Sequence, residues 1–247
     1  MRHTLTSLLL HTALIATSLL AFAPRATAQP ATAALIDAVE PRVIAWRRHI
    51  HENAELSYQE VKTAAYVAEA LRAMPGIEVK TGIAKTGVKA VLRGGKPGPA
   101  IALRADMDAL PVEERNDLPF RSKAKAMWQG KETGVMHACG HDAHVAMLLG
   151  AAEVMSKMRD DLPGTVVFLF QPAEEWGGQG TPSGAALMVA EGALENPKVE
   201  AVFGQHIGSG HPGGVLAWRK GGAMASGDNF HITVKGQGGH GAMPWLS

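Results

Sequence analysis

The sequence has one cysteine, few aromatic residues and almost no net charge. A single cysteine in 247 residues excludes a framework of intramolecular disulfides. With 24 Lys and Arg against 23 Asp and Glu, the formal net charge is +1, which gives no electrostatic case for binding nucleic acid or an anionic membrane. The length suffices for one sizeable domain, or for one domain and part of another. We find no internal repeat.

The longest apolar run lies at the N-terminus. Arg2 precedes a mostly apolar stretch over residues 5–23, and Ala26-Thr27-Ala28 follows with the small-x-small pattern of a signal-peptidase site. The run is short for a membrane span and is interrupted by polar residues. We therefore predict that residues 1–28 are a removable export signal rather than an uncleaved anchor, and that the protein is periplasmic or secreted.

Histidines surround the only cysteine. Residues 137–144 read His-Ala-Cys-Gly-His-Asp-Ala-His, which places Cys139 among three imidazoles. An unpaired thiol is a liability in an oxidising compartment, and a bound metal would tie up the thiolate. A buried, inert cysteine is the alternative for an isolated residue. Because thiolate and imidazole both bind transition metals well, we predict that Cys139 is a metal ligand.

Segments of helical periodicity alternate with short apolar runs. Helical spacing of apolar side chains predicts helices over residues 35–74, 143–158 and 185–190. Runs rich in β-branched or aromatic residues, bounded by Gly or Pro, predict strands over residues 88–92, 100–103, 165–170 and 199–203. This alternation predicts an α/β layered domain, with a central mixed or parallel sheet flanked by helices.

Three segments do not fit this alternation. Residues 113–134 are polar and charged, which predicts a surface loop. The Gly-rich residues 204–227 indicate a linker or a change of element. Residues 229–235 alternate polar and apolar side chains, which predicts a strand of a second, partly exposed sheet.

Adjacent acids follow one of the buried strands. Glu174 and Glu175 come directly after residues 165–170, where ligands bind in open α/β sheets. Neighbouring carboxylates repel each other unless cations or protons compensate. We therefore expect one of them to bind a metal and the other to accept a proton from bound water; a solvated pair of loop acids is the alternative.

Two other predicted strands also end at polar side chains. His206 follows residues 199–203, where a buried, hydrogen-bonded histidine is the alternative to a ligand. Asp106 and Asp108 follow residues 100–103. Metal-bound imidazoles usually donate their second N–H to a carboxylate or carbonyl, so either aspartate is a candidate partner for a ligand histidine, with a loop cap as the competing role.

Six stretches of the chain together match the pattern of one known family. They are residues 47–52, 103–111, 137–144, 170–175, 203–206 and 238–242. Jointly they resemble the M20 metallopeptidases, in the amidohydrolase branch of hippurate hydrolases, N-acyl-amino-acid amidohydrolases and auxin-conjugate hydrolases. The resemblance implies a catalytic domain over residues 29–224 and the start of a smaller α+β lid or dimerisation domain over residues 225–247.

The resemblance also implies a site and a reaction. It implies two divalent metal ions, Zn²⁺ or Mn²⁺, with four residues among the ligands: Cys139, His141, Glu175 and His206. It makes Glu174 the general base, His240 the residue that steadies the scissile carbonyl, and Asp108 a carboxylate behind the ligands. The implied reaction is hydrolysis of the amide bond of N-acyl amino acids or similar small amides and dipeptides, by a protein that forms a homodimer through the lid.

Two rival functions stay open at this point. Cys139 could instead be a nucleophile with a neighbouring histidine as its base. Members of the family continue well past the length of this chain, so the sequence predicts a fragment or a truncated product without the rest of the lid and one further histidine ligand. The second rival is therefore an exported protein that binds metal or ligand with little or no catalysis. The preferred acyl group and amino acid and the native metal are not set by the sequence.

Overall fold

The computed structural model describes residues 30–246 apart from 177, 179, 211, 226–229 and 231. The predicted export signal, residues 1–28, lies outside the described residues. The chain divides into two units, residues 1–207 and 208–247. The predicted domain boundary after residue 224 differs from this division and stays a prediction. Within the described part of the chain, no helix has both the length and the apolar character needed to span a bilayer.

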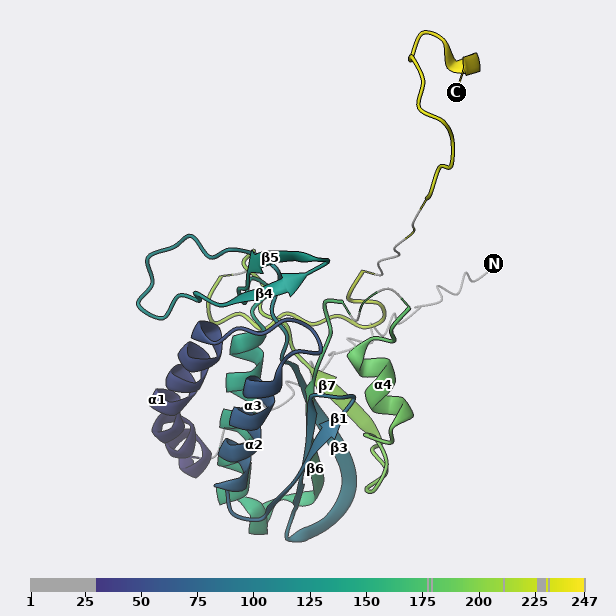
Figure 1. The fold of residues 1–247 in the computed structure, drawn as a ribbon. Coiled ribbons are helices and arrows are strands. Elements are labelled where there is room, and N and C mark those ends of the chain that lie inside the picture. The colour runs from purple at the N-terminus through teal and green to yellow at the C-terminus, as the bar shows by residue number, and fades with distance from the viewer. Residues whose placement is uncertain are drawn as a thin grey trace, which may run out of the picture. The chain divides into compact units, whose positions relative to one another are not determined.

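A five-stranded mixed sheet forms the centre of the first unit (Figure 1). Its strands lie in the order β1 (Ile77–Ile83), β2 (Gly87–Arg93), β6 (Pro163–Gln171), β3 (Lys96–Asp106) and β7 (Ala201–Gly204). β3 is parallel to β6 and β7, whereas β2 is antiparallel to β1 and β6. The predicted α/β layered class with a mixed central sheet is confirmed.

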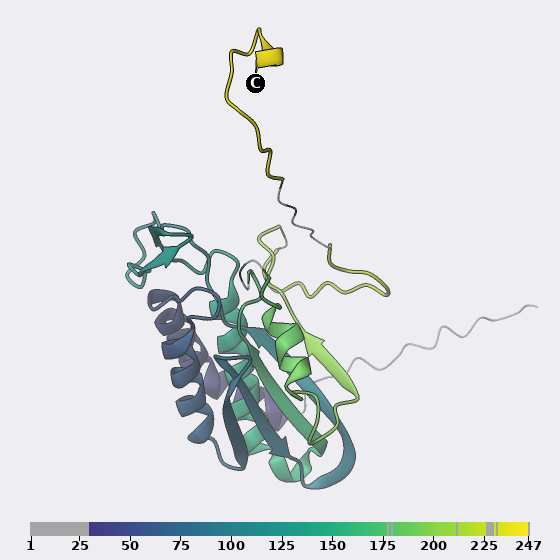
Figure 2. The same ribbon diagram turned by 45° about the vertical axis from the view of Figure 1, so that its right-hand side comes forward.

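Helices cover both faces of this sheet (Figure 2). α2 (Val61–Arg72) and α3 (His141–Lys157) pack on one face, with α1 (Pro30–Glu52) against α3, and α4 (Gly184–Ala190) packs on the other. β6 shows why the central strands are apolar throughout: Phe168 and Phe170 enter the core beneath α2 and α3, while Val167 and Leu169 enter the core beneath α4. Burial of each such side chain contributes about 1.5–3 kcal/mol.

The prediction of one continuous helix over residues 35–74 was wrong. The chain leaves α1 after Glu52 and re-enters a helix at Val61. Between them Leu56 forms a β-bridge with Ala109, and the Glu55 carboxylate accepts the backbone N–H of Thr63 at 2.8 Å, which satisfies a free donor in the first turn of α2. The break contains no Gly or Pro, so local propensity did not reveal it.

The predicted surface loop over residues 113–134 contains a hairpin of β4 (Lys125–Trp128) and β5 (Lys131–Gly134). Its turn residues, Gln129 and Gly130, have φ of 49° and 80°, as a two-residue hairpin turn requires. In the hairpin and in β1 at the sheet edge, polar and apolar residues are mixed and about half of the residues are exposed, so neither has the continuous apolar run that identified the central strands.

In the second unit, the described residues from 208 onward are exposed and form one short 3₁₀ helix, η2 (Pro244–Leu246). The predicted strand over residues 229–235 is not found at residues 230 and 232–235; residues 229 and 231 lie outside the described part. A strand needs a neighbour for its backbone N–H and C=O groups, and none of the described strands pairs with this segment.

Candidate metal centre

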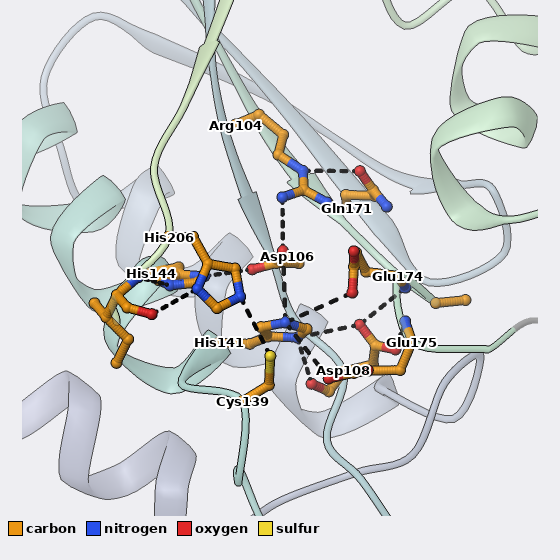
Figure 3. Close-up of polar contacts among 12 residues, drawn as sticks. Arg104, Asp106, Asp108, Cys139, His141, His144, Gln171, Glu174, Glu175 and His206 are labelled. Atoms are coloured by element: carbon orange, nitrogen blue, oxygen red, sulfur yellow. Dashed lines mark hydrogen bonds and ion pairs between the residues drawn. The ribbon is translucent and has the colours of Figure 1, made fainter. Parts of the chain in front are cut away.

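The residues that follow three parallel strands meet the start of α3 (Figure 3). Because β3, β6 and β7 are parallel, their carboxyl ends lie at the same edge of the sheet. This brings together six of the predicted site residues: Asp108, Cys139, His141, Glu174, Glu175 and His206. The donor atoms of Cys139, His141 and His206 lie within 4.8 Å of one another, and so do those of His141, Glu174 and Glu175.

We call Cys139 and His206 the thiol side of the centre. Cys139 Sγ lies 3.3 Å from His206 Nε2. His206 Nδ1 lies 2.6 Å from the carbonyl oxygen of Ile207 and donates its proton to it, which leaves the lone pair of Nε2 directed at the sulfur. Gly140, with φ of 102°, turns the chain from Cys139 into α3 in a conformation that L side chains rarely adopt.

We call Asp108, His141, Glu174 and Glu175 the carboxylate side. His141 Nδ1 donates to the Asp108 carbonyl oxygen at 2.8 Å, so its Nε2 faces the two glutamates, 3.8 Å from Glu174 Oε2 and 3.8 Å from Glu175 Oε1. Burial favours the neutral ring, but the hydrogen bond to Asp108 and the surrounding carboxylates outweigh it and raise the pKa of His141 to about 9. The carboxylate side therefore attracts positive charge.

Asp108 fixes the backbone that carries the two glutamates. Its Oδ1 accepts the N–H of Glu174 and its Oδ2 the N–H of Glu175, each at 3.0 Å, and Oδ2 also accepts the Ser57 hydroxyl at 2.6 Å. Burial opposes ionisation of Asp108, but the hydrogen bonds from His141, Ser57 and the two amides outweigh it and lower its pKa. Asp108 thus orients the glutamates from behind.

The donor set fits a divalent cation. Among the described residues, His141 Nε2 and Glu175 Oε1 are buried without a hydrogen-bond partner, which is costly unless something else satisfies them. Both atoms face the centre, next to the sulfur of Cys139 and the free nitrogen of His206. Sulfur, imidazole nitrogen and carboxylate oxygen are the ligands that Zn²⁺ takes in proteins.

The surroundings of Cys139 argue against a role as nucleophile. Burial and the nearby carboxylates of Glu175 and Glu174 raise the pKa of the Cys139 thiol to about 12. A nucleophilic cysteine needs the opposite shift, because the thiolate is the reactive form. A cation held by the same carboxylates is what would allow the thiolate to form, so the geometry favours Cys139 as a ligand.

The remaining residues of the histidine-rich motif lie behind the centre. Asp142 Oδ2 is 2.9 Å from both Arg47 Nε and His51 Nδ1. His137 is buried, and burial lowers its pKa to about 4. Neither belongs to a group of candidate ligands found among the described residues.

His240 belongs to the second unit, where its Nδ1 accepts the N–H of Ala242 at 3.1 Å. Its role at the scissile carbonyl stays a prediction.

The sequence analysis did not identify Glu60 as part of the site. This buried acid accepts the N–H of Ala173 at 2.9 Å, next to Glu174, and the Thr86 hydroxyl at 2.6 Å. Glu60 was hidden inside the helix predicted over residues 35–74, so no pattern marked it.

A family model described as peptidase family M20/M25/M40 matches residues 102–245. The chain belongs to this family. It is 52% identical over 83% of its length to thermostable carboxypeptidase 2 of Saccharolobus solfataricus, of which the match covers 49%. It is 47% identical over 85% of its length to the N-acyl-L-amino acid amidohydrolase of Geobacillus stearothermophilus, of which the match covers 53%. The predicted M20 resemblance is confirmed.

A solved M20 structure is also similar. The Bacillus subtilis YXEP protein, a dinuclear metal binding peptidase of the M20 family, is 43% identical, with a TM-score of 0.59 over 69% of this chain and 43% of its own. The chain spans about half the length of the curated relatives it matches. Family and fold are thereby established, and the cluster of ligand-type residues lies where such a fold binds its ligands.

Proposed function

We propose that this M20 protein hydrolyses the amide bond of small N-acyl amino acids or dipeptides at a centre of two divalent metal ions. One observation carries the proposal: sulfur, nitrogen and oxygen donors from three separate segments converge, and two of these donor atoms are buried without a hydrogen-bond partner. The donors we assign to the metal ions are Cys139, His141, Glu175 and His206. Cysteine and histidine favour Zn²⁺, and the carboxylate also admits Mn²⁺.

The two glutamates differ in a way that supports separate roles. The Glu175 side chain is 21% exposed and its Oε1 is buried and unpartnered, as suits a ligand. The Glu174 side chain is 41% exposed, so it is accessible to water and substrate. Asp108 holds the backbone N–H groups of both, so the backbone that carries the two carboxylates is fixed at the centre.

In the reaction, Glu174 takes a proton from the attacking water and delivers it to the departing amine. Divalent ions, held by Cys139, His141, Glu175 and His206, would supply a Lewis acid that polarises the amide carbonyl and makes water more acidic. Asp108 keeps Glu174 oriented for both proton transfers. We assign His240 the role of steadying the scissile carbonyl as negative charge develops on its oxygen.

The substrate class follows from what the similar proteins are named for. They include an N-acyl-L-amino acid amidohydrolase, an N-acetyl-L-cysteine deacetylase and an IAA-amino acid hydrolase. In each of these names an acyl group is joined to an amino acid, and we propose the same linkage for this protein's substrate. We further propose export to the periplasm or beyond, on the N-terminal sequence features given above, and a homodimer, which the resemblance to the family implies.

The test compares two isosteric substitutions in the purified, metal-loaded protein, with hippurate and N-acetyl amino acids as substrates. Glu174→Gln should keep the metal content and lower kcat by about 10²- to 10⁴-fold, because it removes the base alone. Glu175→Gln should lose metal. Glu132→Gln, on the exposed hairpin, is the control and should change neither.

Full turnover by the Glu174→Gln variant would refute the assignment of the base. A wild-type protein that takes up metal but releases no amine from any of these substrates would instead support the rival function, a metal-binding protein without catalysis.

A further inference from the structure

Behind the thiol side lies a buried pair that the proposed function does not use. His144, one turn after His141 on α3, and Asp106, at the end of β3, are both buried. His144 Nδ1 lies 2.7 Å from Asp106 Oδ1 (Figure 3). Together with His141 they form a third group of metal-ligand type, so their role has to be decided from their hydrogen bonds.

Both ring nitrogens of His144 are already occupied. Its Nε2 accepts the backbone N–H of Ile207 at 2.9 Å. Since an accepting nitrogen carries no proton, the ring proton is on Nδ1 and is donated to Asp106. No lone pair of His144 is left for a cation, which excludes His144 as a metal ligand in this arrangement.

Arg104 holds Asp106, the other residue of the pair, in place. Its Nη1 donates to Asp106 Oδ2 at 2.6 Å, and its Nε donates to Gln171 Oε1 at 2.8 Å. Asp106 thus has one oxygen on a guanidinium and the other on an imidazole. A carboxylate held in this way accepts a hydrogen bond from the N–H of His144 Nδ1. The ring proton therefore stays on Nδ1, and the lone pair of Nε2 is available to accept the Ile207 N–H.

The hydrogen bond between Ile207 and His144 affects the orientation of the neighbouring residue, His206. Ile207 accepts the Nδ1–H of His206 with its carbonyl oxygen while it donates its N–H to His144. Both backbone groups of Ile207 are therefore used, one to anchor the loop after β7 and the other to set the ring of His206. The rings of His144 and His206 also meet edge to face, with centroids 4.8 Å apart.

We propose that Arg104, Asp106 and His144 form a positioning chain that holds His206 with Nε2 unprotonated and facing Cys139. The inference rests on the proposed metal centre and extends it to residues that hold the ligand. His144 is a positioning residue, and it acts through Ile207. His206 needs such a device because it is exposed and follows an exposed edge strand, so packing alone does not fix its side chain.

The test is a double-mutant cycle on metal affinity, measured by competition between the metal-free protein and a chelator for Zn²⁺. His144→Phe should weaken binding by about 10- to 100-fold, the usual effect of losing a partner that orients a ligand. In a His206→Ala background, the same substitution should have almost no further effect. His144→Gln, which keeps an acceptor for the Ile207 N–H, should weaken binding less than His144→Phe.

His49→Phe is the matched control, since His49 stacks on Tyr66 and its ring makes no contact with the centre among the described residues. If His144→Phe weakens binding equally with and without His206, the effect does not pass through His206 and the proposal is overturned. Should His144→Phe fail to fold, the same cycle is run with His144→Leu, which also removes the acceptor for the Ile207 N–H, with the same two outcomes.

A second readout does not depend on metal. In ¹⁵N NMR spectra of the metal-free protein, His206 should carry its proton on Nδ1. His144→Phe should return it to a mixture of tautomers, whereas His144→Gln should keep more of the Nδ1–H form. An unchanged His206 tautomer in the His144→Phe variant overturns the positioning chain. A wild-type protein that binds no Zn²⁺ refutes the proposed centre, and the NMR result then still decides whether His144 orients His206.

Discussion

The two sides of the candidate metal centre differ in how they are held. On the carboxylate side, Asp108 and His141 are buried and joined through backbone amides and carbonyls to β3, β6 and α3. On the thiol side, Cys139 is half-buried and His206 is exposed, and both lie in loops. Substitutions of the buried Asp108 and His141 should therefore destabilise the fold, whereas those on the thiol side should weaken metal binding and leave the fold intact.

The largest effect is expected for Asp108→Ala. This change leaves the backbone N–H groups of Glu174 and Glu175 without a hydrogen-bond acceptor. It also removes one of the negative charges that stabilise the protonated His141 ring. Loss of one partner from a buried charged network costs about 3–5 kcal/mol. Chemical denaturation of the metal-free protein should show a loss of that size. A loss below about 1 kcal/mol would mean that the carboxylate side is not part of the structural core.

Cys139→Ser should leave the stability of the fold nearly unchanged and weaken metal binding. Serine is nearly isosteric, and Cys139 is only half-buried, so the free energy of unfolding of the metal-free protein should change by less than about 0.5 kcal/mol. The affinity for Zn²⁺ should fall by more than the roughly 100-fold that loss of an orienting partner can cause, because a direct ligand is removed. Calorimetric titration with Zn²⁺ measures this. Unchanged affinity would remove Cys139 from the centre.

The smallest effect is a pH dependence that belongs to Glu60, which accepts the N–H of Ala173 next to the carboxylate side. Burial raises the pKa of Glu60 from 4.5 to about 6. Between these values the folded state binds more protons than the unfolded state, so the free energy of unfolding should decrease as the pH rises from 4.5 to 6. Over this range, the titration of Glu60 should lower the free energy of unfolding by about 2 kcal/mol.

Denaturation of the metal-free protein across this range should show that slope, and Glu60→Gln should reduce it, since the pKa of Glu175, which burial also raises, contributes a slope of the same sign. Glu78→Gln, at an exposed position of β1, is the control and should leave the slope in place. The same slope in the wild type and in the Glu60→Gln variant would show that Glu60 is not the group responsible.

The same contrast explains what could be predicted from sequence. The strands at residues 88–92, 100–103 and 165–170 are buried on both faces, so their apolar runs identified them. β1 and the β4–β5 hairpin are exposed and gave no such signal. The break between α1 and α2 depends on a contact with Ala109, which is distant in the sequence.

For the site, abrupt changes from apolar to acidic or imidazole residues at strand ends pointed to Glu174, Glu175 and His206. The links that hold them could not be predicted in this way. Glu60 and Ala173 are 113 residues apart, and His144 and Ile207 are 63 apart. Periodicity reports on neighbours along one element, whereas these hydrogen bonds depend on how elements pack.

The convergence of Cys139, His141, Glu175 and His206 on shared cations is tested most directly by anomalous X-ray diffraction from crystals soaked in Zn²⁺. The account predicts anomalous peaks for two ions, with Cys139 Sγ about 2.3 Å from at least one of them and each ligand atom of the histidines and Glu175 about 2.0–2.2 Å from at least one of them. Zinc bound elsewhere on the protein, with no peak within bonding distance of these four side chains, would contradict it.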